Sequence, residues 1–159
     1  MRKVKITACQ FRVEKVASFK EFEDQVMELM DQVPADSDYV LFPELFTVGL
    51  LASFPNADHL TAADLIKIDE YTPQYKELFR NLAKDRKQVI IAGSHLERRG
   101  DQYYNIAYIF DTDGSSVEHK KTHIFPAESG WQTSEGDELE VHSIGPAKIG
   151  LAVCYESEI

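Results

Sequence analysis

The order of segments along the sequence is the feature that most constrains the fold of this 159-residue chain. Two short β-prone runs, at residues 4–10 and 38–42, are separated by an amphipathic helical pattern at residues 18–33. A second helical pattern begins at Thr72. Only strand-like runs come after it, at residues 88–95, 103–111, 116–121, 138–144 and 148–153. Strands that alternate with amphipathic helices and are then followed by further strands indicate a layered α/β protein with helices packed on a sheet.

Both helical segments carry their own boundary signals. Ser18 is followed three residues later by Glu21, which is the spacing of a capping box, and Pro34 ends the first pattern. The second helix is predicted to begin at Thr72-Pro73, because proline suits the first helical position. The apolar residues of the first helix recur at three- and four-residue steps and share one face: Phe19, Phe22, Val26, Leu29, Met30 and Val33.

The composition is that of a soluble globular protein and excludes several classes of partner. The net charge is −10 at pH 7, and the basic pairs Arg98-Arg99 and Lys120-Lys121 are isolated. Binding to nucleic acid or to an anionic membrane needs clustered basic residues, so neither partner is expected. No apolar stretch reaches the ~20 residues of a membrane span, and the N-terminus does not resemble a signal peptide. We therefore expect a cytoplasmic protein in which residues 1–159 form one domain.

Three polar residues follow strand-like runs, and their chemistry is complementary. Glu44 follows YVLFP, Lys121 follows SVEHK, and Cys154 follows KIGLAV. Ligands of α/β folds bind at the carboxyl ends of strands, so these three side chains are candidates for one site. A thiolate can attack a carbonyl carbon, a carboxylate can take up and return the proton, and an ammonium group can stabilise the oxyanion. Such a site would hydrolyse an amide through a thioester intermediate.

Each of these residues also has an ordinary structural interpretation. Cysteine is among the most frequently buried residue types, and Cys9, which lies within a strand-like run, is assigned to the core. Glu44 could instead stabilise a helix N-terminus, and Lys121 could be a solvated surface lysine. His119 and His123 are four residues apart, a metal-binding spacing on a helix, but they flank a strand end and are placed near a pocket mouth. Spacing alone does not favour catalysis over these interpretations.

Three ordered sequence blocks carry a resemblance to a known family. They are LFPELF, HKKTHIFPAE and IGLAVCYE, with supporting similarity in ACQF, VIIAGSHLER and YYNIAYIFDTDG. The blocks resemble the signatures of the carbon–nitrogen hydrolase (nitrilase) superfamily, whose catalytic Glu, Lys and Cys fall here on Glu44, Lys121 and Cys154. The similarity extends over the whole chain.

This resemblance implies a fold, a reaction and supporting residues. The implied fold is an αββα sandwich, of which this chain would form the N-terminal part. The implied enzyme cleaves non-peptide amide or N-carbamoyl bonds of small molecules, forms homo-oligomers and uses no metal or organic cofactor. Glu128, in FPAE, would orient the catalytic groups, and the backbone N–H of Tyr155 would help to bind the oxyanion.

The chain also departs from the family pattern. True nitrilases tend to have Trp directly after the cysteine, so Tyr155 favours an amide substrate over a nitrile. The motifs LFPELFT, EYTPQY and GSHLER resemble a bacterial branch that is sometimes fused to an N-acetyltransferase domain, of which this chain contains no sequence. Family members continue well past the cysteine, whereas this sequence ends five residues after Cys154. Two alternatives therefore stay open: a catalytically silent fragment or interaction domain, and an enzyme that transfers the acyl group to an amine.

Overall fold

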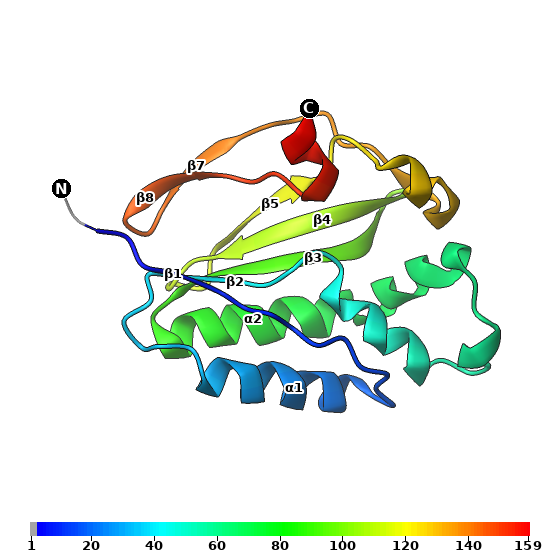
Figure 1. Cartoon of the computed structure of the whole chain (residues 1–159), viewed down its shortest axis with the longest axis horizontal. Helices are drawn as coiled ribbons and strands as arrows, with labels where there is room; N and C mark the ends of the chain where they lie inside the picture. Colours follow the sequence, from blue (N-terminus) through cyan, green and yellow to red (C-terminus); the bar gives the residue numbers. More distant parts are fainter. Residues whose placement is uncertain (1–2) are drawn as a thin grey trace.

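The computed structural model describes residues 3–159, which form three stacked layers (Figure 1). Two long helices, α1 (Phe19–Asp31) and α2 (Thr72–Arg86), lie on one face of a six-stranded sheet, and a two-stranded sheet lies over the opposite face. The α/β fold predicted from the order of segments is confirmed. The first two residues of the expected 1–159 domain lie outside the described residues. Among residues 3–159, none of the helices combines the length and the apolar character that a membrane span requires.

The central sheet combines parallel and antiparallel strands. Its path runs through β1 (Ile6–Ala8), β2 (Tyr39–Leu41), β3 (Val89–Arg99), β4 (Gln102–Phe110) and β5 (Ser116–Lys120), and β6 (Thr133–Ser134) pairs with β4. Strands β1, β2 and β3 are parallel because a helical crossover joins each pair. Strands β3, β4 and β5 are antiparallel because only short turns join them. The carboxyl ends of β1 and β2 therefore meet at one edge of the sheet.

Helix α1 begins where the sequence signals predicted. The backbone N–H of Glu21 donates to the Ser18 hydroxyl at 3.3 Å, and the N–H of Ala17 donates to the Glu21 carboxylate at 2.7 Å. Helix α2 begins at Thr72, and Pro73 lies in its first turn as predicted. The two helices cover a core of packed aromatic rings from Phe11, Phe22, Phe42, Phe46, Tyr75 and Phe79.

Short 3₁₀ helices form much of the chain between the regular elements. Three of them connect β2 to α2: η1 (Phe46–Ser53), η2 (Ala57–His59) and η3 (Ala62–Tyr71). Two more, η4 (Pro126–Trp131) and η5 (Cys154–Glu158), come after β5 and after the last strand. Cys154 is the first residue of η5, Glu128 lies in η4, and Glu44 lies just before η1.

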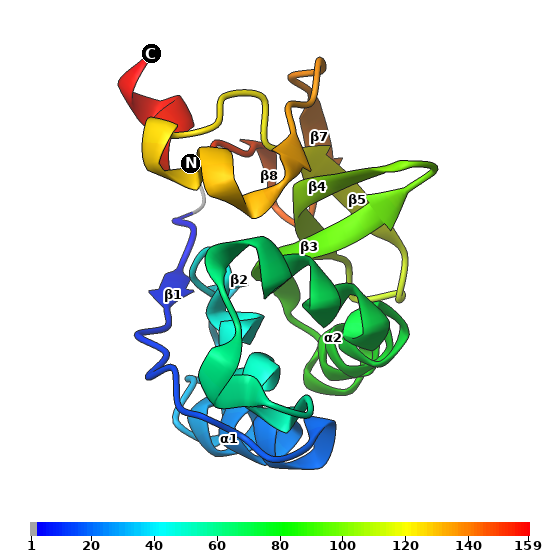
Figure 2. The same cartoon turned by 90° about the vertical axis from the view of Figure 1, so that its right-hand side faces the viewer.

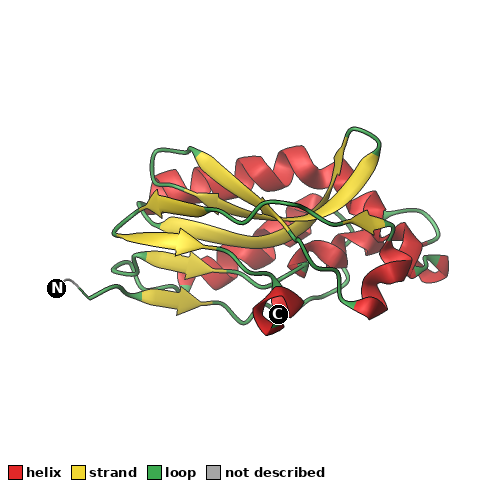
Figure 3. Ribbon diagram, turned by 90° about the horizontal axis from the view of Figure 1, so that it is seen from above, coloured by secondary structure: helices red, strands yellow, loops and turns green. Residues whose placement is uncertain are grey.

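The second sheet is a hairpin of β7 (Val141–Ile144) and β8 (Ala147–Gly150), which lies over the central sheet, on the side away from the helices (Figure 1 and Figure 3). The Tyr39 hydroxyl on β2 donates to the Ile144 carbonyl at 2.6 Å and accepts the Ala147 N–H at 3.0 Å. One side chain of the central sheet thereby holds both strands of the hairpin. Strand β7 is shorter than the predicted run at 138–144, because the residues before it extend into solvent, with Leu139 73% exposed. Strand β8 ends at Gly150, before the end of the predicted run at 148–153.

Candidate active site

A close approach of two backbone segments fixes the loop that presents Glu44. A bulge in β3 contains Gly93, whose φ is +60°. A Cβ atom at Gly93 would lie 2.0 Å from the carbonyl oxygen of Pro43, so a larger residue cannot occupy this position without moving the loop. Beside it, the Ser94 hydroxyl accepts the backbone N–H of Leu45 at 3.1 Å. The β3 bulge therefore holds the residue on each side of Glu44.

His95 holds the next part of the same loop. Burial and the charge of Lys76 lower the pKa of His95 to about 3, so its imidazole is neutral at pH 7. Its Nδ1 lies 3.0 Å from the Thr47 hydroxyl and its Nε2 lies 3.1 Å from the Thr72 hydroxyl. These two bonds attach η1 and α2 to the same strand that supports Glu44.

Lys121 lies between two carboxylates. It follows β5 directly, and its side chain is only 1% exposed. Its Nζ donates to Glu44 Oε1 at 2.9 Å and to Glu128 Oε1 at 2.6 Å. Burial alone would lower the pKa of Lys121, but the hydrogen bonds and charges of Glu128 and Glu44 outweigh burial and raise it. Lys121 is therefore a fixed cation at pH 7.

Asn105, on β4, is a second hydrogen-bond donor to the Glu44 carboxylate. Its Nδ2 donates to Glu44 Oε1 at 2.8 Å, the same oxygen that accepts the Lys121 bond. The backbone carbonyl of Asn105 also accepts the backbone N–H of Lys121 at 2.9 Å. Because Oε1 receives both donors, the second carboxylate oxygen of Glu44 is available to another partner. Sequence reasoning did not select Asn105, which lies in the apolar run of a strand.

Cys154 lies beside the Glu44 carboxylate. It is the first residue of η5, and its φ of +53° lies in the left-handed region, which costs a non-glycine residue about 1–3 kcal/mol. Burial raises the pKa of the thiol, as do the charge and hydrogen bond of Glu44, while Lys121 and the Tyr155 N–H offset part of this rise. The thiol is therefore protonated at pH 7 and lies against a carboxylate that can accept its proton.

Tyr155 completes the group of residues predicted from the sequence. Its backbone N–H hydrogen-bonds Cys154, and its ring packs edge-on against Phe125 with centroids 5.4 Å apart. Figure 2 shows η5 beside the chain that leads into η4, the segment that carries Glu128. Glu44, Lys121, Glu128, Cys154 and Tyr155 thus lie together, although they come from four separate parts of the chain.

His119 and Glu156 form a buried pair that the sequence did not predict. His119 Nε2 lies 2.9 Å from Glu156 Oε2, and the two side chains are 6% and 3% exposed. His119 is thus held in the interior beside the site, whereas His123 is exposed. The one sequence signal for the pair is that Glu156 belongs to the CYE motif. Within residues 3–159, no group of three His, Cys, Asp or Glu side chains is arranged to hold a metal ion.

Comparison with known proteins identifies the family. The carbon-nitrogen hydrolase family model matches residues 5–159. The chain belongs to this family. It is 37% identical over 157 residues to the probable hydrolase YhcX of Bacillus subtilis, a match that covers 98% of the chain and 30% of the relative. It is 31% identical over 104 residues to the omega-amidase NIT2-B of Xenopus laevis, covering 55% of the chain and 38% of the relative.

A solved structure shares the fold of this carbon–nitrogen hydrolase family member. XC1258 of Xanthomonas campestris, described as a CN-hydrolase superfamily protein with an arsenic adduct in its active site, aligns with a TM-score of 0.79 at 21% identity. The alignment covers 99% of this chain and 56% of XC1258. The chain thus spans about half the length of that structure and less than half the length of the two curated relatives.

In this family member, two hollows adjoin Glu44. One, of about 220 Å³, extends between the central sheet and residues 151–154, so that Glu44 and Cys154 both border it. The other, of about 560 Å³, opens on the side of η1 and η3. Apart from Glu44, the side chains that line this second hollow are apolar: Val13, Leu45, Val48, Leu51, Leu65 and Trp131. An apolar group bound there would lie beside the carboxylate.

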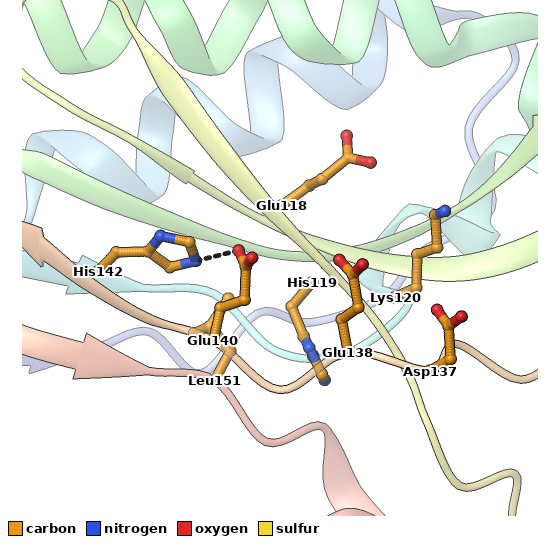
Figure 4. A pocket seen from close by; sticks show the side chains of 8 residues that line it. All are labelled: Glu118, His119, Lys120, Asp137, Glu138, Glu140, His142 and Leu151. Atoms are coloured by element: carbon orange, nitrogen blue, oxygen red, sulfur yellow. Dashed lines mark ion pairs between the residues drawn. The ribbon is translucent and has the colours of Figure 1, made fainter.

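A third hollow, of about 70 Å³, lies elsewhere, between β5 and residues 137–142 (Figure 4). Glu118 and Lys120 point to one side of β5 and His119 points to the other, as alternate residues of a strand do. The walls of this third hollow also include Glu140, which pairs with His142 at 3.5 Å. None of the five predicted site residues lines this hollow, so the chemistry of Cys154 is separate from it.

Proposed function

We propose that this chain carries the catalytic groups of an amide hydrolase that acts through a thioester on Cys154. The observation that carries the proposal is the arrangement around Lys121: a buried ammonium group lies between two carboxylates, and a thiol lies against one of them. Family membership and the similarity to an omega-amidase support amide hydrolysis as the reaction.

In the first half of the reaction, Glu44 takes the proton of the Cys154 thiol as the sulfur adds to the carbonyl carbon of the amide. The oxyanion that forms is stabilised by the Lys121 ammonium group and the Tyr155 N–H. When the tetrahedral intermediate collapses, the C–N bond breaks and protonated Glu44 gives its proton to the leaving nitrogen. Ammonia or an amine departs, and the acyl group remains on sulfur as a thioester.

In the second half, Glu44 removes a proton from water as the water oxygen adds to the thioester carbonyl. The C–S bond then breaks, the carboxylic acid leaves, and the proton returns to Cys154. Glu128 takes no part in these proton transfers, because the thiol lies beside Glu44 and not beside Glu128; Glu128 is bonded to Lys121 and holds the ammonium group in place. The same thioester could pass its acyl group to an amine, which would make the enzyme a transferase.

The apolar hollow beside Glu44 indicates which amides react best. A neutral alkyl amide such as butyramide can place its chain against Leu45, Val48 and Trp131. Succinamic acid has a carboxylate at the end of a chain of similar length, and the hollow offers that charge no cation among its lining residues. We expect the kcat/KM for ammonia release to be higher for butyramide than for succinamic acid, by a factor on the order of ten or more.

The measurement is ammonia release from both amides by the purified protein, with Cys9→Ala as the control variant. Cys9 is partly buried against the core and lines neither hollow beside Glu44, so its replacement should leave the ratio of the two kcat/KM values unchanged. A higher kcat/KM for succinamic acid would contradict the assignment of the hollow. Absence of ammonia release from every amide tested would contradict the proposed reaction itself.

A further inference from the structure

Both oxygens of the Glu156 carboxylate are engaged. The side chain is 3% exposed, yet it belongs to a short terminal turn on the surface of the central sheet. Oε2 accepts the backbone N–H of Val153 at 2.6 Å, and Oε1 accepts the backbone N–H of Thr122 at 2.6 Å. The Thr122 hydroxyl adds a third bond at 2.6 Å, and His119 Nε2 lies 3.0 Å and 2.9 Å from the two oxygens.

These bonds join the two chain segments that carry the reacting groups. Val153 immediately precedes Cys154, and Thr122 immediately follows Lys121. His119 lies two residues before Lys121 on β5. Glu156 therefore ties the turn that holds the thiol to the strand end that holds the ammonium group, at a sequence separation of 34 residues from Thr122.

We propose that Glu156 is a positioning residue, which holds the Cys154 turn against the end of β5 and so sets the place of the thiol relative to Lys121 and Glu44. This role rests on the proposed function only in naming Cys154 as the reacting group. The contacts themselves do not depend on which amide, if any, the protein hydrolyses.

The turn needs such a restraint because its geometry is strained. Cys154 has a left-handed backbone at φ +53°, a conformation that persists in non-glycine residues only when surrounding contacts impose it. Within the turn, the Ser157 hydroxyl donates to the Cys154 carbonyl at 2.8 Å. The bonds of Glu156 to Thr122 and His119 connect this turn to the end of β5, and its bond to the Val153 N–H lies within the turn itself.

The chemistry of the contacts requires a carboxylate of this length. Each oxygen accepts a backbone N–H, so both must be acceptors. Glutamine offers one acceptor oxygen and one NH₂ group, which would face an N–H donor. Burial raises the pKa of Glu156, but the hydrogen bonds from Thr122, Val153 and His119 outweigh burial and lower it, so the ionised form is present at pH 7.

The first test compares Glu156→Gln with Glu158→Gln, a matched control in which an exposed glutamate of the same turn is changed. The readout is the pH midpoint of iodoacetamide alkylation at Cys154, with Cys9 as the internal reference. In the unmodified protein the charge of Glu44 contributes to the raised pKa of Cys154, opposed by Lys121. We expect Glu156→Gln to move the midpoint down toward the ordinary thiol value of about 8.5, because the released thiol leaves Glu44. Glu158→Gln should leave it unchanged.

An unchanged midpoint in Glu156→Gln, or an equal shift in Glu158→Gln, would overturn the proposal. Alkylation needs no substrate turnover, so its outcome is separate from that of the proposed function. A shifted midpoint in a protein that hydrolyses no amide would support the positioning role and contradict the proposed reaction. Where turnover is measurable, kcat should fall about tenfold or more while KM changes little.

A second pair of variants covers the case in which Glu156→Gln does not fold. Thr122→Ser keeps the hydroxyl that donates to Glu156, whereas Thr122→Val keeps the shape and removes this donor. We expect Thr122→Val to shift the Cys154 midpoint in the same direction as Glu156→Gln by a smaller amount. Thr122→Ser should keep the midpoint of the unmodified protein. Equal midpoints in the two variants would contradict a restraint that acts through Glu156.

Discussion

Replacement of Cys154 by alanine is expected to lower kcat/KM for a neutral amide on the order of 10⁴-fold or more. The reason is that Cys154 is the sulfur against which Glu44 and Lys121 are arranged, and its loss removes the atom that forms the thioester. The side chain is exposed, so the free energy of unfolding should change by no more than about 0.5 kcal/mol. The measurement is the rate of ammonia release together with thermal unfolding.

Cys9→Ala is the matched control for this experiment. Cys9 packs against the aromatic core, and burial raises the pKa of its thiol, which makes it a poor nucleophile. Replacement of Cys9 should leave kcat/KM unchanged and lower the free energy of unfolding instead. Activity that survives in Cys154→Ala but is lost in Cys9→Ala would contradict the assignment of the nucleophile.

Replacement of Lys121 by methionine is expected to damage both stability and activity. The ammonium group neutralises Glu44 and Glu128, and without it two carboxylates face each other in a site from which water is largely excluded. Removal of one member of a buried ion pair costs about 3–5 kcal/mol, and the lower end applies here because Glu44 is 23% exposed. The catalytic loss should be on the order of 10²–10³-fold in kcat, since an oxyanion donor is also removed.

Lys120→Met is the control variant for Lys121→Met. Lys120 is its neighbour on β5, but its Nζ lies over the ring of Tyr104 at 5.0 Å and forms no part of the carboxylate cluster. Its loss should cost about 0.5–1 kcal/mol and leave kcat unchanged. Denaturant unfolding at pH 7 and ammonia release measure both effects. Similar unfolding free energies for the two variants would show that Lys121 does not hold the cluster together.

The elements that could be predicted from the sequence are those whose signals lie within a few neighbouring residues. The start of α1 was predictable because Ser18 and Glu21 make their bonds within one helical turn. The grouping of Glu44 and Lys121 was also predictable, because each follows a strand and the sheet brings strand ends together. The specific family blocks then pointed to Cys154, which spacing alone did not single out.

The features that the sequence did not predict depend on contacts between distant segments. The bulge in β3 needs a glycine at position 93 because the Pro43 carbonyl lies too close to leave room for a side chain, and neither residue signals the other in the sequence. Glu156 looks like a solvated acidic residue until the fold brings Thr122 to it. The last strand ends at Gly150, although the apolar pattern continues to residue 153, because within residues 3–159 no strand pairs with residues 151–153, which lead into the turn at Cys154.

The intact mass of the protein, acid-quenched during turnover of a neutral amide, shows directly whether Cys154 carries the acyl group. Glu44, Lys121 and Cys154 are arranged to place the acyl group on sulfur with loss of ammonia. We expect a fraction of protein whose mass is increased by the acyl group minus one hydrogen, with the adduct on the peptide that contains Cys154. Ammonia release without any such adduct, or an adduct that persists in Cys154→Ala, would contradict it.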